Sequence, residues 1–182
     1  MFGKNETVCL LGDAPNLVEY NNFKEKGAII IALNRAFTKQ KADIHFFADR
    51  RYVVGNQETF DYNLSAIYPK CFNYPFKKSL TYNPVWEIDQ VFKGRLKAGH
   101  SVLIPALHYV LMRQPKKVIL FGVQLNNHDH WYGKQATETI FPCKNRVFSE
   151  VKGLVESFKN IPVFSGSSDS FLVSQGLINV YK

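Results

Sequence analysis

Four short and almost uninterrupted apolar runs constrain the fold of this chain more than any other feature. They are TVCLLG (7–12), AIIIAL (28–33), DIHFFA (43–48) and KVILFG (117–122). Strands of a parallel sheet that is covered on both faces have this pattern, because neither side of such a strand meets water. Two weaker runs, SAIYP (65–69) and IPVFSG (161–166), predict further strands.

Segments with helical character separate these strands. PNLVEYNNF begins with a proline, which is favoured in a first helical turn. HSVLIPALHYVLMRQ is apolar around most of its circumference, has Ser101 as a cap and carries Pro105 near its start. NRVFSEVKGLVESFKN has one apolar stripe, formed by Val147, Val151, Leu154 and Phe158. The alternation predicts an α/β fold, a Rossmann-like doubly wound and mainly parallel sheet.

The length of 182 residues predicts a single domain that spans residues 1–182. Residues 70–97 are rich in aromatic residues, basic residues and prolines and have no clean period, so we expect an irregular excursion there. We expect residues 124–145 to form a lid. No apolar run approaches the roughly 20 residues of a membrane span. The N-terminus lacks signal-peptide features, which predicts a cytoplasmic protein.

The formal net charge of +8 and the pI near 9.4 favour an anionic partner. A nucleotide, a phosphorylated substrate, a nucleic acid or an acidic surface would fit, although the charge could also serve solubility alone. Cys9, Cys71 and Cys143 form no CxxC pair, so neither a disulfide framework nor a cysteine zinc site is predicted. We expect Cys9 to be a core residue. A homo-oligomer is left open.

Polar or turn-forming residues follow each predicted strand. The first is followed by Gly12-Asp13-Ala14-Pro15-Asn16, the second by Asn34 and Arg35, the third by Asp49, Arg50 and Arg51, and the fourth by residues 122–135. Ligands bind outside the carboxyl ends of the strands in open α/β sheets. We therefore expect these clusters to converge on one crevice.

Each cluster also has a simpler interpretation. Gly12 could form only a strand-to-helix turn, or it could let the backbone approach a phosphate. Asn34 could cap a helix, or its amide could pair with a base or a ribose. Asp49 could be a cap or an ion-pair partner of the neighbouring arginines, and alone it indicates no metal site.

The segment NNHDHWYGK places His128 and His130 two residues apart, with Asp129 between them. The two histidines would share one face of a strand, which suits a metal, but Asp129 would point away and no third ligand is evident. General acid or base catalysis by one of them is the other functional alternative, because histidine titrates near neutral pH. Trp131 and Tyr132 could form a stacking wall or anchor the lid.

The segment before the long apolar helix is a second candidate for anion binding. Gly99, His100 and Ser101 would offer amides and a hydroxyl, and Arg95 and Lys97 come just before them. The two histidines within predicted core elements, His45 and His108, are expected to be buried residues with satisfied hydrogen bonds.

The order of these motifs resembles that of the bacterial lipooligosaccharide sialyltransferases and of related phage and bacterial proteins, a group that includes pterin pyrophosphokinase-like domains. The similar features are a strand that ends in Gly-x-x-Pro-Ser, a second that ends in Asn, a third that ends in Asn or Asp, a small-residue segment before a long helix, and a strand that ends in Gly-Ile/Val-Asp. Here these are GDAPN, Asn34, Asp49, AGHSVLIPALHYVLMRQ and GVQ, and the small-polar loop GSSDS follows the closing strand.

The resemblance implies the glycosyltransferase-A-like variant of the fold and binding of a nucleotide sugar without a metal or other cofactor. It also implies that six residues lie at, or roughly at, nucleotide-contacting positions: Gly12, Asn16, Asn34, Asp49, Arg95 and Ser101. Tyr132 falls near a tyrosine that helps the phosphate leave. Arg95, Lys97 and the amides of the first turn would hold the phosphates, and His130 or His128 would deprotonate the acceptor.

The chain departs from the sialyltransferase pattern at two places. The family's histidine base precedes the last amphipathic helix, where this chain has Phe141, Pro142 and Cys143, and the Asp after the fourth strand is Gln124. A metal-independent glycosyltransferase is the first hypothesis. A nucleotide-binding module without turnover and a glycosyltransferase that acts on DNA are the alternatives.

Overall fold

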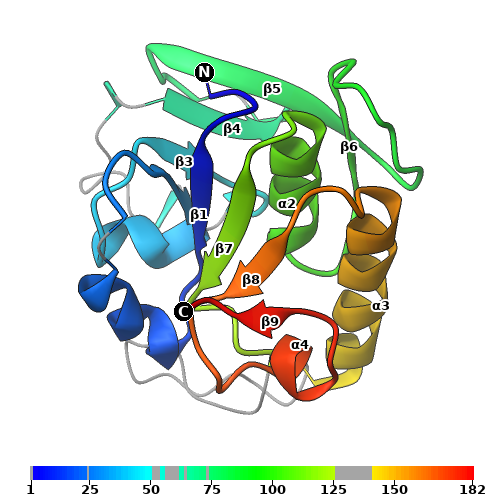
Figure 1. Cartoon of the computed structure of the whole chain (residues 1–182). Coiled ribbons are helices and arrows are strands. Elements are labelled where there is room, and N and C mark those ends of the chain that lie inside the picture. Colours follow the sequence, from blue (N-terminus) through cyan, green and yellow to red (C-terminus); the bar gives the residue numbers. More distant parts are fainter. Residues whose placement is uncertain are drawn as a thin grey trace.

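The computed structural model describes residues 2–23, 25–50, 54–55, 62–63, 65–72, 74–125 and 141–182. Within them, nine strands form one open sheet in the order β6-β5-β4-β3-β2-β1-β7-β8-β9 (Figure 1). The strands are β1 (Thr7–Leu11), β2 (Ile29–Leu33), β3 (Ile44–Phe46), β4 (Ser65–Pro69), β5 (Lys78–Val85), β6 (Arg95–Lys97), β7 (Lys117–Phe121), β8 (Val163–Ser165) and β9 (Asn179–Val180). All neighbouring strands are parallel. The predicted Rossmann-like α/β fold is confirmed.

The central strand β1 is buried on both faces, as its uninterrupted apolar run predicts. Val8 and Leu10 belong to a core on one face of the sheet, whereas Cys9 and Leu11 belong to a core on the other. Parallel pairing continues this alternation into the neighbours, because Cys9 is in register with Ile30 of β2 and Ile119 of β7. The two cores hold β1 between them.

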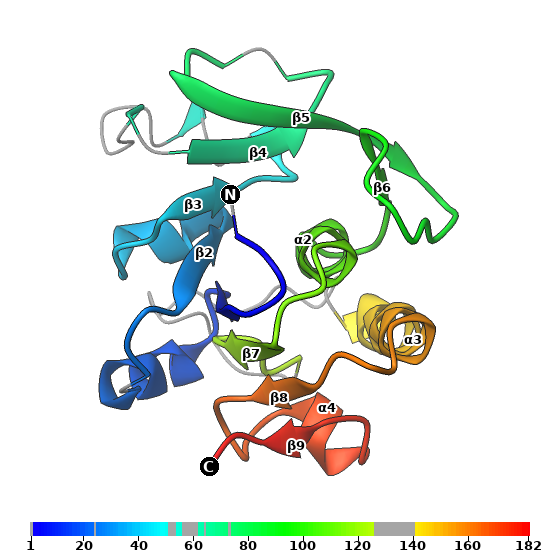
Figure 2. The same ribbon diagram turned by 45° about the horizontal axis from the view of Figure 1, so that its top comes forward.

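Helices cover both faces of the sheet (Figure 2). The helices α2 (Leu103–Met112) and α3 (Phe141–Ser157) pack on one face, and the 3-10 helices η1 (Pro15–Asn22) and η2 (Asn34–Thr38) pack on the other. A short helix, α4 (Phe171–Ser174), follows β8. The predicted stripe of the last amphipathic helix is confirmed, since all four of its members are buried: Val147, Val151, Leu154 and Phe158. No helix in these described ranges has the length and apolar character needed to cross a bilayer.

The expectation of an irregular excursion over residues 70–97 is wrong at two places, where β5 and β6 lie within this range. These outer strands lack the apolar runs of the central ones. In β5 only Tyr82 is buried, and in β6 only Leu96 is. Pro84 is tolerated because β5 pairs with β4 only up to Tyr82 and with β6 beyond it.

His108 holds the outer strands against α2. The backbone N–H of Lys97 donates to its Nδ1 at 2.7 Å, so Nε2 carries the ring proton and donates to the carbonyl of Asp89 at 2.8 Å. Burial of the imidazole lowers the pKa of His108, which keeps the ring in this neutral form. The prediction of a buried, hydrogen-bonded core histidine is confirmed.

Of the three cysteines, Cys9 is fully buried, and burial, assisted by the negative charge of Glu25, raises the pKa of its thiol to about 12. Its predicted place in the core is confirmed. Cys71 is exposed. The side chain of Cys143 lies outside the part that the structure describes.

A polar cluster links the first residues of β1 and β7 to Glu25, before β2, and to Tyr181, just after β9. The Glu25 carboxylate accepts hydrogen bonds from Thr7 Oγ1 at 2.5 Å and Tyr181 Oη at 2.6 Å, and Lys117 Nζ lies 2.7 Å from it. Burial alone would raise the pKa of Glu25, but these hydrogen bonds and the charge of Lys117 lower it to about 2. The ionised carboxylate therefore stabilises the fold.

The stability of the chain should depend on the ionisation of Glu25. Since its pKa falls from 4.5 to about 2 on folding, the stabilisation is complete above pH 4.5 and is lost as the pH falls toward 2. Urea denaturation between pH 7 and pH 3 should show a shallower loss of stability for E25Q than for the wild type, and a lower stability of E25Q at pH 7. The control is E156Q, which removes an exposed carboxylate paired with Lys152 and should leave the pH dependence unchanged. Identical slopes for E25Q and the wild type would contradict this assignment.

Candidate functional site

The carboxyl ends of the parallel strands lie along one edge of the sheet. From β1 the chain winds outward through β2 to β6, and then crosses through α2 to β7 on the other side of β1. The strand order therefore reverses between β1 and β7, whose arrowheads point to the same edge (Figure 1). In open α/β sheets, ligands bind at such a switch point.

The backbones that leave β1 and β7 contact each other directly. Gly12 N donates to Phe121 O at 2.7 Å, and Ala14 N donates to Gly122 O at 3.0 Å. A Cβ atom on either glycine would lie 2.3 Å from the carbonyl oxygen of the other, and Gly122 has a φ of +66°. Glycine is thus required at both positions. The turn at Gly12 therefore both leads into η1 and packs against the end of β7.

Asn16 carries the strongest indication of a ligand at this switch point. It follows Pro15 in η1, and only 6% of its surface is exposed. Neither its Oδ1 nor its Nδ2 has a hydrogen-bond partner among the described residues. A buried amide without partners costs free energy. A ligand that both donates and accepts hydrogen bonds would remove this cost.

Gln124, three residues after the end of β7, has a similar buried amide and was not among the predicted binding residues. It is 4% exposed, its Nε2 donates to Asp169 Oδ2 at 2.5 Å, and its Oε1 has no partner within the described ranges. Asp169 belongs to the small-polar loop after β8, and Ser167 of the same loop donates to Glu19 of η1 at 2.9 Å. The signal that could have identified Gln124 is a polar residue within three positions of the end of a buried strand.

The ends of β2 and β3 lie together, as the strand-end argument predicts. Asn34 has a φ of +46°, a conformation that asparagine tolerates better than most residues. Its Oδ1 accepts a hydrogen bond from Ala48 N at 3.4 Å, next to the half-buried Asp49. The alternative interpretation of Asn34 as a helix cap is wrong, because Leu33 is the N-cap of η2.

Arg95 and Lys97 are not brought to this switch point, because β6 is the outermost strand on its side of the sheet. The Arg95 guanidinium lies 3.3 Å from the carboxylates of both Glu87 and Asp89. Lys97 Nζ donates to Trp86 O at 2.9 Å. Both cations therefore already have partners in the segment that joins β5 and β6.

Ser101 lies just before α2, which runs back along the sheet, so the start of this helix lies at the carboxyl edge. Its Oγ accepts a hydrogen bond from Leu103 N at 3.2 Å, but the N-cap residue of α2 is Val102, so the prediction of Ser101 as the helix cap is wrong by one residue. The neighbouring His100 contacts Glu150 of α3, with 2.8 Å between Nδ1 and Oε1.

The predicted catalytic residues His128, His130 and Tyr132 lie outside the described residues, as does most of the expected lid at 124–145. Their roles remain predictions. Within the described ranges, no three side chains of His, Cys, Asp or Glu are grouped so as to hold a metal ion.

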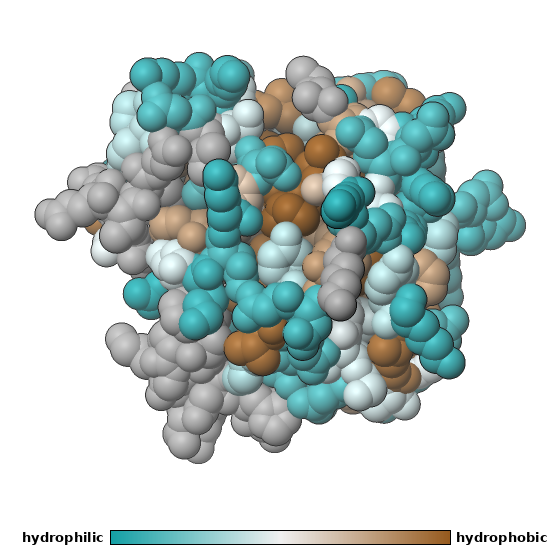
Figure 3. Space-filling view, turned by 60° about the vertical axis from the view of Figure 1, so that its left-hand side comes forward, coloured by the Kyte–Doolittle hydropathy of each residue, from teal (hydrophilic) through white to brown (hydrophobic). Residues whose placement is uncertain are grey.

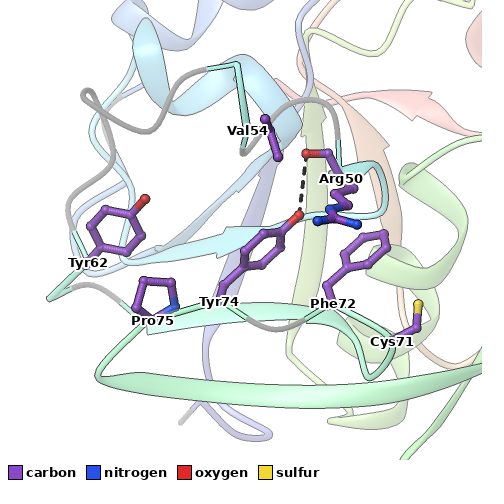
Figure 4. Close-up of a pocket in the computed structure, with 7 residues that line it drawn as sticks. All are labelled: Arg50, Val54, Tyr62, Cys71, Phe72, Tyr74 and Pro75. Atoms are coloured by element: carbon purple, nitrogen blue, oxygen red, sulfur yellow. Dashed lines mark hydrogen bonds between the residues drawn. The ribbon is translucent and has the colours of Figure 1, made fainter.

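A separate pocket of about 510 Å³ lies over β4, on the side of the sheet that faces η2. Figure 4 shows the rings of Tyr62, Phe72 and Tyr74 on one side of it, with Arg50 and Val54 opposite. Tyr74 Oη donates to Arg50 O at 3.4 Å. The pocket therefore combines aromatic surfaces with one cation.

Comparisons with solved structures support the fold. The chain is similar to the sialyltransferase CstII from Campylobacter jejuni in complex with cytidine-5′-monophosphate, with a TM-score of 0.61, 10% identity and coverage of 100% of this chain and 87% of that one. For a CST-II complex with a trisaccharide acceptor and CMP, the TM-score is 0.59 and the identity is 11%, with coverage of 97% of this chain and 86% of that one. For the apo α-2,3-sialyltransferase from C. jejuni, the TM-score is 0.52 and the identity is 13%, with coverage of 98% of this chain and 83% of that one. No family model and no curated protein matches the chain.

Alanine at Gly122 should destabilise the protein strongly, because it adds both a left-handed residue and a clash with Gly12. Gly27 is the matched control, since its φ is +80° but nothing lies within 4 Å of an added Cβ. We expect a loss of about 1–2 kcal/mol for G27A and about 2–5 kcal/mol for G122A in chemical denaturation. Equal losses would show that the backbones of residues 12 and 122 are not in close contact.

Proposed function

We propose that this chain is a glycosyltransferase that takes a sugar from a nucleotide sugar and binds the nucleotide at the β1–β7 switch point. The observation that carries the proposal is Asn16, whose buried amide lacks hydrogen-bond partners in the described structure. The similarity to sialyltransferase structures that contain CMP supports it at the level of the fold.

The residues at the strand ends have distinct roles in this proposal. The backbone at Gly12 and the Asn16 amide hold the nucleotide beside β1. Asn34 and Asp49 orient the nucleoside from the ends of β2 and β3, and because Asn34 Oδ1 faces Ala48, its Nδ2 is the group that meets the ligand. Ser101 bounds the site from the start of α2. Arg95 and Lys97 take no part, since their charged groups are engaged elsewhere.

The chemistry of the reaction requires no metal in this proposal. A histidine, with His130 and His128 as the candidates from the sequence, accepts the proton of the acceptor hydroxyl, and Tyr132 donates a hydrogen bond to the departing phosphate. Turnover should therefore persist in the presence of EDTA, and its loss on chelation would contradict the metal-free mechanism.

Replacing Asn16 by leucine, which has a similar shape, should separate binding from stability. The substitution removes an amide that has no hydrogen-bond partner among the described residues, so the free protein should be as stable as the wild type or more stable. The affinity for CMP should fall about 5- to 150-fold, which corresponds to the roughly 1–3 kcal/mol cost of lost ligand hydrogen bonds. Calorimetric titration with CMP and thermal unfolding of the free proteins measure the two effects.

The control for N16L is N21L, which changes an asparagine of the same 3-10 helix that is exposed and bonded to Gln40. Unchanged CMP affinity in N16L would contradict the proposed site. The rival function is a nucleotide-binding module without turnover. Mass spectrometry distinguishes the two functions by measuring the release of CMP from CMP-N-acetylneuraminic acid, with and without a sugar acceptor. A protein that binds CMP but releases none from this donor is the module.

A second candidate function is glycosyl transfer to nucleic acid, which the aromatic pocket favours. Tyr62, Phe72 and Tyr74 offer rings on which bases could stack, and Arg50 offers a charge. Exposed lysines occur in the chain on either side of the pocket residues, namely Lys39, Lys41, Lys70, Lys77 and Lys78. In the view of Figure 3, hydrophilic side chains extend over much of the surface around smaller apolar areas.

If nucleic acid binds there, Y74A should weaken binding of a twelve-residue oligo-dT by about 5- to 150-fold, since one stacked base contributes about 1–3 kcal/mol. The control is W86A, which removes an aromatic side chain that is 69% exposed and lies outside the pocket. Fluorescence anisotropy at about 50 mM salt measures both, and binding should weaken steeply as salt rises. No binding by the wild type, or equal losses in Y74A and W86A, would reject this function.

A further inference from the structure

His100 and Glu150 form a hydrogen-bonded pair between the two helices on one face of the sheet. His100 lies in the loop between β6 and α2, and Glu150 lies on α3. Glu150 binds His100 twice, because Oε1 lies 2.8 Å from the ring Nδ1 and Oε2 accepts a hydrogen bond from the backbone N–H of His100 at 3.1 Å. This double contact fixes both the loop and the plane of the imidazole.

The contact with Arg146 indicates which ring nitrogen carries the proton. Arg146 Nη1 lies 3.4 Å from His100 Nε2. A guanidinium group can only donate hydrogen bonds, so Nε2 must be the acceptor. Nδ1 then carries the proton and donates it to Glu150. This is the arrangement of a general base, in which one nitrogen is oriented by a carboxylate and the other has a lone pair that can accept a proton once Arg146 is displaced from it.

The imidazole of His100 is more exposed than the carboxylate of Glu150, and a general base must be accessible to the substrate. The Glu150 side chain is only 14% exposed, whereas that of His100 is 31% exposed. The carboxylate is thus held within the helix interface while the imidazole stays accessible. Both helices run opposite to the strands, so the start of α2, which His100 precedes, lies toward the carboxyl edge, where the switch point is (Figure 1). His100 contacts Glu150 near the middle of α3.

We infer that His100 is the general base of the transfer reaction and that Glu150 is its positioning residue. This inference rests on the proposed function, and it places the base on the scaffold of described residues instead of at His128 or His130. The acceptor is a hydroxyl compound, which replaces Arg146 at Nε2.

The proposed step balances as follows. Nε2 takes the proton of the acceptor hydroxyl, and the oxygen forms a bond to the anomeric carbon of the donor sugar. The bond between that carbon and the phosphate oxygen breaks, and its electron pair leaves with the nucleotide phosphate. The resulting imidazolium is stabilised by Glu150 and later releases its proton to water.

The test is CMP release from CMP-N-acetylneuraminic acid by the wild type, H100A, E150Q and E150D, with water or lactose as acceptor. We expect H100A to lower kcat by about 10²–10⁴-fold while its Kd for CMP stays within about twofold. Added imidazole should restore part of the activity of H100A, an effect that a purely structural role would not give. E150Q should lose less than H100A, and E150D should be closer to the wild type than E150Q.

E156Q, a change of an exposed carboxylate on the same helix, is the matched control and should keep wild-type kcat. A second measurement does not depend on turnover: ¹⁵N spectra of the imidazole should show His100 with its proton on Nδ1 in the wild type and lose this preference in E150Q. A wild-type spectrum with the proton on Nε2 would overturn the inference.

The failure of this inference and the failure of the proposed function are distinguishable. If the wild type releases CMP and H100A releases it equally fast, the base role of His100 is wrong and the glycosyltransferase stands. If H128Q/H130Q loses turnover while H100A does not, the base lies in that segment. If the wild type neither binds CMP nor releases it, both the proposed function and the base role are rejected.

Discussion

The contact between Gly12 and Gly122 is the constraint on which the candidate site depends. These residues follow the two central strands, and each occupies the space that a side chain on the other would need. Their approach fixes the start of η1 beside the exit of β7, which places Asn16 and Gln124 at the same switch point. A bulkier residue at either glycine would separate the two segments and remove the arrangement that the proposed nucleotide site requires.

The buried amides of Asn16 and Gln124 at this switch point lower the stability of the free protein but favour ligand binding. Their polar atoms that lack hydrogen-bond partners among the described residues lower the stability of the free protein, and the core around β1 must offset that cost. The same amides are already oriented when a ligand arrives, so their hydrogen bonds cost little further ordering. In contrast, the Glu25 cluster and His108 have complete sets of partners, which is consistent with purely structural roles.

The central part of the fold could be predicted from the sequence because β1, β2, β3 and β7 are buried on both faces and have continuous apolar runs. The outer strands could not, because β5 and β6 bury one side chain each and their pairing depends on neighbours far away in the chain. Gly12, Asn16, Asn34 and Asp49 could be predicted to lie at the carboxyl edge because parallel strands end at a common edge. The partners of Arg95 and the pairing of His100 with Glu150 depend on how loops and helices pack, which no local pattern reveals.

The most direct test of the account is an amide ¹H–¹⁵N spectrum of the protein during titration with CMP. The account predicts saturable shifts of the Asn16 side-chain amide and of the backbone amides of Gly12, Ala14 and Gly122, with smaller changes near Asn34 and Ser101. Shifts confined to the Arg50–Tyr74 pocket, or an Asn16 amide that does not respond at saturating CMP, would contradict it.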